Sequence, residues 1–121
     1  MRIVAWIGAA SVALGACASS GAVPADKLAR SQAAVRSAQE LGAEQVPTAA
    51  LHLKLANDEV AQARKLIIDG DNKRAEYILL RAEADADAAL ALAREVHARA
   101  DAQKTMDEVQ RLKNSQQPEG T

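Results

Sequence analysis

The sequence predicts an all-α protein in which three antiparallel helices form a small hairpin or bundle, with the third helix much longer than the others. Alanine makes up about a quarter of the chain, and phenylalanine is absent. Apolar residues recur three and four positions apart, which is the spacing of one face of an α-helix. Glycine and proline interrupt this pattern at only a few points. An N-terminal signal peptide is expected to precede the helices.

Residues 1–16 have the features of that signal peptide. A cationic start is followed by an apolar run, which is shorter than the roughly 20 residues needed to span a bilayer. The run ends in Leu14-Gly15-Ala16-Cys17. This order of an aliphatic residue, two small residues and a cysteine resembles the lipobox of bacterial lipoproteins. The resemblance implies that Cys17 is acylated and that its acyl chains anchor the protein to a membrane.

Two other outcomes remain open at this site. Ala16-Cys17-Ala18 also fits the A-x-A pattern of ordinary signal peptides, so cleavage after Ala18 would release a soluble periplasmic protein. An uncleaved anchor is the third outcome. In a Gram-negative host, Ala18 would not retain a lipoprotein in the inner membrane as aspartate does. The lipobox resemblance therefore implies an outer-membrane location, on the periplasmic face.

Residues 17–24 carry the cysteine and a short tether, because they are small and polar and show no periodicity. The first helix is predicted over about residues 25–41, with Gly42 as its stop. Its buried face should consist of residues at alternating spacings of three and four: Leu28, Ser31, Val35 and Ala38.

The second helix is predicted over about residues 47–69. Pro47 suits the first helical position, and Gly70 suits the end of the helix. The short connections on either side of this helix favour antiparallel neighbours. Its buried face follows the same spacing: Leu53, Ala56, Val60, Ala63 and Ile67.

The third helix is predicted over about residues 71–113, followed by a disordered tail at residues 114–121. Asp71 is suited to cap its first turn. Two charge pairs, Arg81/Asp85 and Glu95/Arg99, have the i,i+4 spacing that supports a helix. Its predicted stripe is dominated by alanine: Ala75, Leu79, Ala82, Ala86, Ala89, Ala93, Val96 and Ala100.

The third helix is longer than its neighbours can cover. It would extend about 65 Å, against about 35 Å for the second helix. Beyond about Arg99 it would fray, pair with another subunit or project as a single helix. We expect the exposed apolar residues of this part to form an interaction surface. They are Val96, Ala100, Met106, Val109 and Leu112.

Four features occur in this order between Ser31 and Ala91. They are a helix end at Leu41-Gly42-Ala43, then Pro47, the turn at Gly70-Asp71 and the segment from Ala82 to Ala86. In these features the sequence resembles the alanine-rich bacterial family called domain of unknown function 4398. The resemblance implies a periplasmic, lipoprotein-attached helical domain, which in some proteins precedes an OmpA-like peptidoglycan-binding domain. No OmpA-like segment is expected here, so neither peptidoglycan binding nor any catalytic residue is implied.

The composition disfavours an enzyme or a cofactor protein. The formal net charge is -1, without a basic stripe, so nucleic-acid binding is not expected. The two histidines, His52 and His97, fall on different predicted helices and have no ligand cluster around them. No metal, cofactor or small-molecule substrate is therefore expected, because so few large side chains could hardly enclose a site.

The remaining hypothesis is a structural or protein-interaction element of the cell envelope. Its partners would be the membrane, through the acyl chains, and either copies of itself or another envelope protein. One alternative is a tetratricopeptide-like module that holds a peptide, which an open groove beside Leu51 or Leu55 would favour. Another is a soluble periplasmic carrier, if Cys17 is not acylated. A wall-linked spacer is disfavoured because the chain ends in Pro118 to Thr121 without a lysine.

Overall fold

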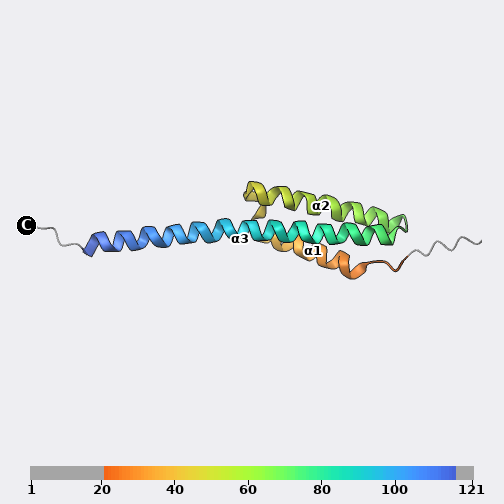
Figure 1. Cartoon of the computed structure of the whole chain (residues 1–121), viewed down its shortest axis with the longest axis horizontal. Coiled ribbons are helices and arrows are strands. Elements are labelled where there is room, and N and C mark those ends of the chain that lie inside the picture. The colour runs from red at the N-terminus through yellow and green to blue at the C-terminus, as the bar shows by residue number, and fades with distance from the viewer. Residues whose placement is uncertain (1–20, 117–121) are drawn as a thin grey trace, which may run out of the picture.

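The computed structural model describes residues 21–116, nearly all of which are helical (Figure 1). The elements are α1 (Ala25–Glu40), the single 3-10 turn η1 (Ala43–Gln45), α2 (Pro47–Ile68) and α3 (Asn72–Gln116). No strand occurs within this part of the chain. The all-α prediction with a long third helix is therefore confirmed.

Three predicted features lie outside the described residues. They are the signal peptide at residues 1–16, the lipidation site Cys17, and the last five residues of the predicted tail. The other three residues of that tail, Asn114 to Gln116, belong to α3. Side-chain hydrogen bonds support this last turn, including one from the Ser115 hydroxyl to the Leu112 carbonyl at 2.9 Å.

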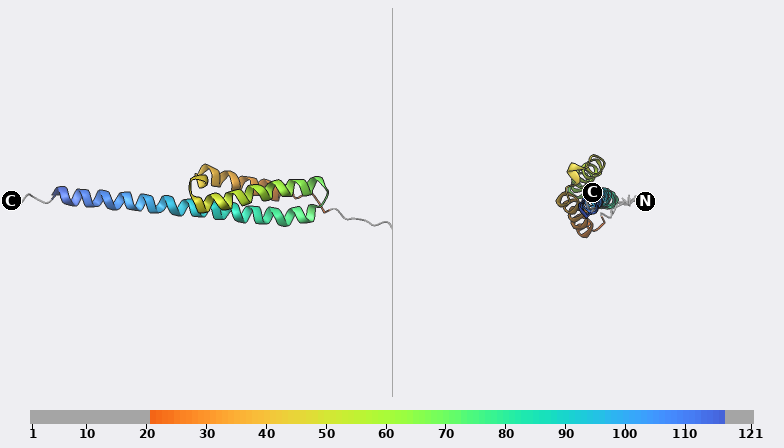
Figure 2. Two further views of the ribbon diagram at one scale, coloured as in Figure 1. Left: turned by 90° about the horizontal axis from the view of Figure 1, so that it is seen from above. Right: turned by 90° about the vertical axis from the view of Figure 1, so that its left-hand side faces the viewer.

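The three helices run up, down and up, and α1 and α2 both pack against α3. Both α1 and α2 pack more extensively on α3 than on each other, and they lie along its first half (Figure 2). The longer shared boundary is between α2 and α3. α3 is therefore the common partner that holds the bundle together. Among the described residues, no helix has an apolar stretch long enough to cross a membrane.

The two connections are short because a glycine reverses the chain in each. Gly42 has φ +78° and Gly70 has φ +80°, in the left-handed region that glycine adopts without strain. After α2, the Gly70 N–H donates to the Ile67 carbonyl at 3.1 Å and the Asp71 N–H to the Leu66 carbonyl at 2.8 Å. These two bonds form a Schellman motif, which closes the helix end.

The first turns of α2 and α3 are also formed as the sequence predicts. Pro47 occupies the first turn of α2, where its missing N–H leaves no helical hydrogen bond unmade. At the start of α3, the Arg74 N–H donates to the Asp71 carboxylate at 3.2 Å. Asp71 thus caps the first turn of the helix, as predicted.

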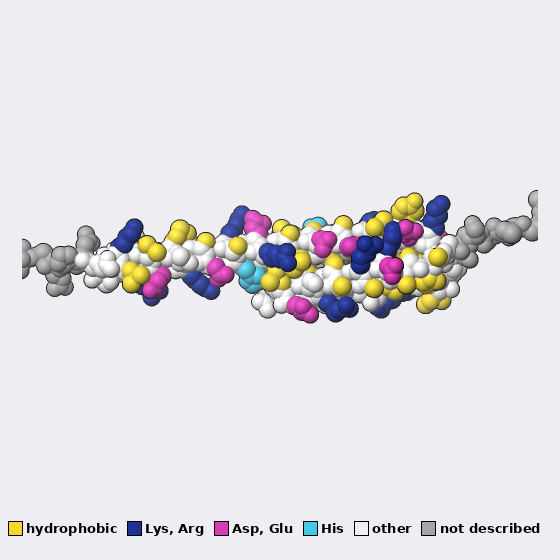
Figure 3. Space-filling view, turned by 90° about the horizontal axis from the view of Figure 1, so that it is seen from below, with side chains coloured by type: hydrophobic (Ala, Val, Ile, Leu, Met, Phe, Trp, Pro, Cys, Tyr) yellow, Lys and Arg dark blue, Asp and Glu magenta, His cyan; other side chains and the backbone are white. Residues whose placement is uncertain are grey.

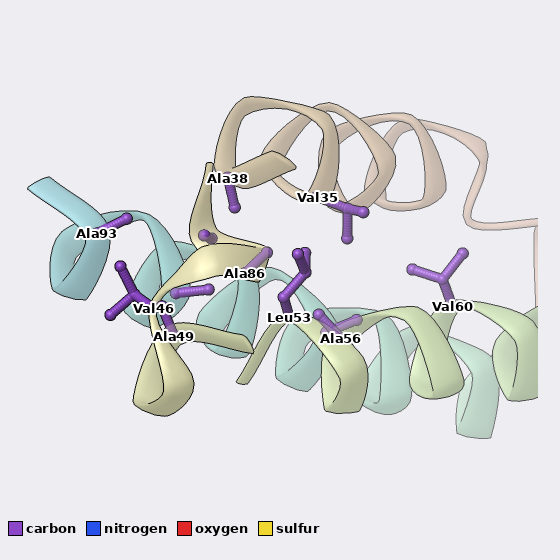
Figure 4. Close-up of a cluster of buried hydrophobic side chains, with 12 residues drawn as sticks. Val35, Ala38, Val46, Ala49, Leu53, Ala56, Val60, Ala86 and Ala93 are labelled. Carbon is purple, nitrogen blue, oxygen red and sulfur yellow. The ribbon is translucent and has the colours of Figure 1, made fainter. Parts of the chain in front are cut away.

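The core is built mainly from alanine. Fifteen hydrophobic residues of the described chain are buried, and ten of these are alanines with no exposed surface. Figure 4 shows short side chains from all three helices converging between them. Because an alanine side chain is a single methyl group, burying it requires the helix backbones to approach closely. The predicted stripes are buried through Ala93, whereas Leu28 and Ile67 are half-buried.

Ser31 lets α1 approach α3 in the same way. Its side chain is fully buried, and its Oγ lies 2.8 Å from the Lys27 carbonyl and 2.9 Å from the Leu79 carbonyl. The hydroxyl can donate to either oxygen, so burial leaves it no unmet donor. The contact with Leu79 links the side chain of α1 to the backbone of α3.

α3 continues as a single helix past the end of the bundle. Every residue from Arg94 to Gln116 is exposed, and this segment projects alone from the three-helix body (Figure 1). Near the end of the bundle, His97 Nε2 lies 3.0 Å from the Leu41 carbonyl oxygen. The following 19 residues extend about 28 Å. We call residues 98–116 the extension.

We predict that Ala38→Leu destabilises the protein by about 1–3 kcal/mol, because the larger side chain must separate α1 from its neighbours. Urea denaturation followed by circular dichroism at 222 nm measures the change in the free energy of unfolding. Ala33→Leu is the matched control, because Ala33 lies on the same helix but is exposed. Equal stability of the two variants would show that the fit at Ala38 is not tight.

Candidate functional site

The predicted interaction surface is exposed, but it falls on two sides of α3. Val96, Met106, Val109 and Leu112 have exposed fractions of 45%, 58%, 45% and 53%. The helix turns about 100° per residue, so nine residues from Ala100 to Val109 amount to a half-turn offset. Val96 and Ala100 therefore lie on one side and Val109 and Leu112 on the other, with Met106 at the edge between them.

The first side continues the buried stripe of the bundle and ends with it. Val96 and Ala100 follow Ala93 at the same spacing of three and four. The next positions on this side are polar: Gln103, Asp107 and Arg111. The apolar stripe thus stops close to His97, where the bundle ends. Beyond Ala100, this side therefore presents polar residues along the extension.

The second side has an apolar pattern of its own. Its residues are spaced four, three, four and three apart, which is the heptad spacing of a coiled coil. Met106 lies beside them, and apolar side chains are visible along the projecting helix in Figure 3. We call this set the outer seam: Ala98, Ala102, Thr105, Val109 and Leu112.

Sequence reasoning found only part of the outer seam. Val109 and Leu112 were predicted, whereas Ala98, Ala102 and Thr105 were not. The signal was present in the sequence, because the seam repeats the four-three spacing of the buried stripe with an offset of two residues. Such an offset moves a residue about 200° around a helix, which places the seam on the side facing away from the bundle.

Ion pairs and hydrogen bonds along the helix support the extension. One joins Arg99 Nη2 to Glu95 Oε1 at 2.5 Å, as predicted, and another joins Arg111 to Glu108. Gln103 also donates to Asp107 at 2.8 Å. Exposed pairs of this kind contribute roughly 0.2–0.5 kcal/mol each. They favour the helix without covering its apolar side.

The other predicted charge pair, Arg81 with Asp85, is not formed, so this prediction is wrong. Both side chains reach across to α2 instead: Arg81 Nη2 lies 2.7 Å from Glu59 Oε1, and Asp85 Oδ1 lies 2.8 Å from His52 Nδ1. Each cross-helix partner lies close to α3 because the alanine core brings the two helices together. The sequence alone gave no sign of these two contacts.

Glu59 is the most buried charged side chain in the described chain, at 6% exposure. Its Oε2 atom is buried without a hydrogen-bond partner. Burial raises the pKa of the Glu59 carboxyl, the neighbouring Asp85 raises it further, and the Arg81 guanidinium opposes the shift. The arrangement links two helices, and no group of three or more His, Cys, Asp or Glu residues in the described chain could hold a metal ion.

A shallow groove of about 370 Å³ lies between α1 and α2. Its floor includes Val35 and Val60, and polar side chains such as Arg36 and Arg64 form its rim. Neither Leu51 nor Leu55 lines it, although these residues are 59% and 40% exposed. This groove therefore lacks the exposed leucines that would favour a peptide-binding module.

We predict that Glu59→Gln reduces the pH dependence of stability. Because the pKa of Glu59 is raised in the folded state, its stabilising contribution is complete below the unfolded value of 4.5 and is lost as the pH rises through the folded value. Urea denaturation at about pH 4 and about pH 7 measures this loss. The variant should lose less stability between the two pH values than the wild type. The same substitution at exposed Glu40 is the control, and an identical pH profile for all three proteins would contradict the prediction.

One comparison with known proteins identifies a family. No curated protein and no solved structure matches the chain. The family described as Domain of unknown function (DUF4398) matches residues 26–105, which include all of α2 and most of α1 and α3. Because this match covers more than half of the sequence, the chain belongs to the DUF4398 family.

Proposed function

We propose that this protein is a lipid-anchored, non-enzymatic element of the bacterial cell envelope that presents the extension of α3 to a protein partner. The observation that carries the proposal is the extension itself. Its residues are exposed, and its apolar residues gather on the side away from the bundle. A helix with an apolar side and no neighbour is a typical surface for helix-mediated recognition.

The membrane anchor in this proposal depends on the lipobox at Cys17. The described chain begins four residues later, and the Gly21 carbonyl accepts a hydrogen bond from the Asn72 side chain at 2.5 Å. Gly21 therefore lies beside the first turn of α3. The other end of α3 lies about 67 Å away along the helix. An anchor at Cys17 would thus be attached near the end of α3 that lies opposite the extension.

The small-residue core of the bundle also supports a structural role. Its buried residues are mostly alanine, which leaves no deep apolar cavity for a substrate, and the groove between α1 and α2 is shallow. The cross-helix pairs of Glu59 and His52 join helices rather than line a cleft. The described residues therefore favour a helical spacer over a catalyst.

We predict that the mature protein in envelope fractions begins at an acylated Cys17. Intact-mass analysis of the processed chain would then give the mass of residues 17–121 plus acyl groups. Cys17→Ala should leave the chain without lipid and release it from membranes, because no acyl chain remains to partition into the bilayer. Ser20→Ala, which leaves the lipobox intact, is the control. A mature chain that begins at Ser19 without lipid would overturn the anchor.

A further inference from the structure

We propose that the end of the bundle nearest Cys17 is a docking surface for the phospholipid bilayer into which the acyl chains insert. We call this part of the molecule, residues 21–30 and 64–77, the anchored end. The inference rests on the proposed function, because it requires the acyl chains at Cys17. It goes further, since it assigns a second contact with the membrane to side chains of the folded domain.

The length of chain between Cys17 and the bundle limits how far the anchored end can lie from the bilayer. The start of α1, the end of α2 and the start of α3 lie together at this end (Figure 1). Gly21 is tied to it by the hydrogen bond from the Asn72 side chain. Gly21 follows Cys17 by four positions, over which an extended chain spans at most about 14 Å. Acyl chains at Cys17 would therefore keep the anchored end close to the lipid headgroups.

Large apolar side chains are exposed at the anchored end. Ile68, the last residue of α2, is 83% exposed, more than any other large hydrophobic residue of the described chain. Val23 and Tyr77 are 58% and 62% exposed. Tyr77 lies only about 8 Å along α3 from the first residue of the helix. Isoleucine and valine gain free energy on leaving water, and tyrosine favours the boundary between headgroups and acyl chains.

The anchored end is basic, whereas the rest of the described chain is acidic. It contains six Lys and Arg residues and four Asp and Glu residues, against eight and eleven in the described residues outside it. Two of its four acidic side chains are paired within it, Glu76 with Lys27 and Asp71 with Arg74. This charge distribution favours the approach of the anchored end, rather than of the remaining bundle, to a surface with anionic headgroups.

Lys65 and Lys73 are placed to meet those headgroups. Both are exposed, and neither forms an ion pair with another described residue. Lys65 lies one turn before Ile68 on the same side of α2, and Lys73 lies in the first turn of α3. A lysine can reach the phosphates while a neighbouring apolar residue enters the acyl region. Asp26 and Asp69 oppose this attraction, so docking depends on apolar contact and net charge together.

A tryptophan at position 68 tests the docking. The only tryptophan of the chain, Trp6, precedes Cys17, so a chain that begins at Cys17 and carries Ile68→Trp contains a single one. The lipidated protein is reconstituted in vesicles of phosphatidylcholine and phosphatidylglycerol, with or without bromine on the acyl chains. We predict that the emission shifts to shorter wavelength and is quenched by the brominated lipid, because the side chain enters the acyl region.

Leu51→Trp is the matched control for this measurement. Leu51 lies on the same helix and is 59% exposed, so neither substitution replaces a buried side chain. It lies about 26 Å from Ile68 along the helix, toward the opposite end of the bundle. Its emission should not be quenched. Flotation of the vesicles in a density gradient reports separately whether each chain is anchored.

The other results contradict the proposal in distinguishable ways. Vesicles that carry the protein without quenching at position 68 overturn the docking surface and leave the anchor intact. Equal quenching at positions 51 and 68 also overturns it, because α2 would then lie along the bilayer over its whole length. A chain that carries no lipid and does not float with the vesicles overturns the proposed function, and the docking inference falls with it.

Charge reversal tests the contribution of the two lysines. We predict that Lys65→Glu/Lys73→Glu, in the chain with Ile68→Trp, weakens docking to the anionic vesicles by roughly tenfold, because two attractive charges become repulsive. The quenching at position 68 should fall accordingly. Lys104→Glu/Lys113→Glu makes the same change in net charge on the extension and is the control. Equal quenching in the two double variants would show that Lys65 and Lys73 do not meet the headgroups.

Discussion

The close approach of α2 and α1 to α3 is the constraint on which the rest of the structure depends. Ten fully buried alanines and Ser31 occupy the boundaries between the helices. A single methyl group is excluded from water only when the opposing backbone comes near, so the helices must pack tightly or not at all. At roughly 25 cal/mol per Å² of buried apolar surface, each contact contributes little. Long helices with many such contacts are therefore needed for a stable fold.

An alanine core leaves the register between α2 and α3 weakly determined by packing. A slip along the helices would replace one alanine contact by another of the same size. The pairs Glu59–Arg81 and His52–Asp85 form only in the observed register, at 2.7 Å and 2.8 Å. Glu59 is buried and its pKa is raised, so the pair is costly to leave unmade. These contacts give the bundle the specificity that its small side chains do not provide.

The two sides of the helix α3 carry different residue patterns. One side holds the apolar stripe that is buried through Ala93 and ends at exposed Ala100, and the other holds the outer seam that continues to Leu112. On the first side, the residues are polar from Gln103 onward, just beyond the end of the bundle. The outer seam gains its larger side chains in the same region. The change of side is consistent with a helix that leaves its own bundle to meet a partner.

Much of this architecture could be predicted from the sequence, because helix formation depends on local properties. Residue spacing, the turns at Gly42 and Gly70 and the first-turn position of Pro47 determined the three helices and their direction. The predicted lipobox at Cys17 also depends on contiguous residues alone, and it lies outside the described residues. Only the tertiary structure showed that α3 continues unpartnered to Gln116, and that Arg81 pairs with Glu59 rather than with Asp85. Those outcomes depend on which helix surfaces meet. The alanine side chain is too small and uniform for a pattern of alanines to specify these contacts.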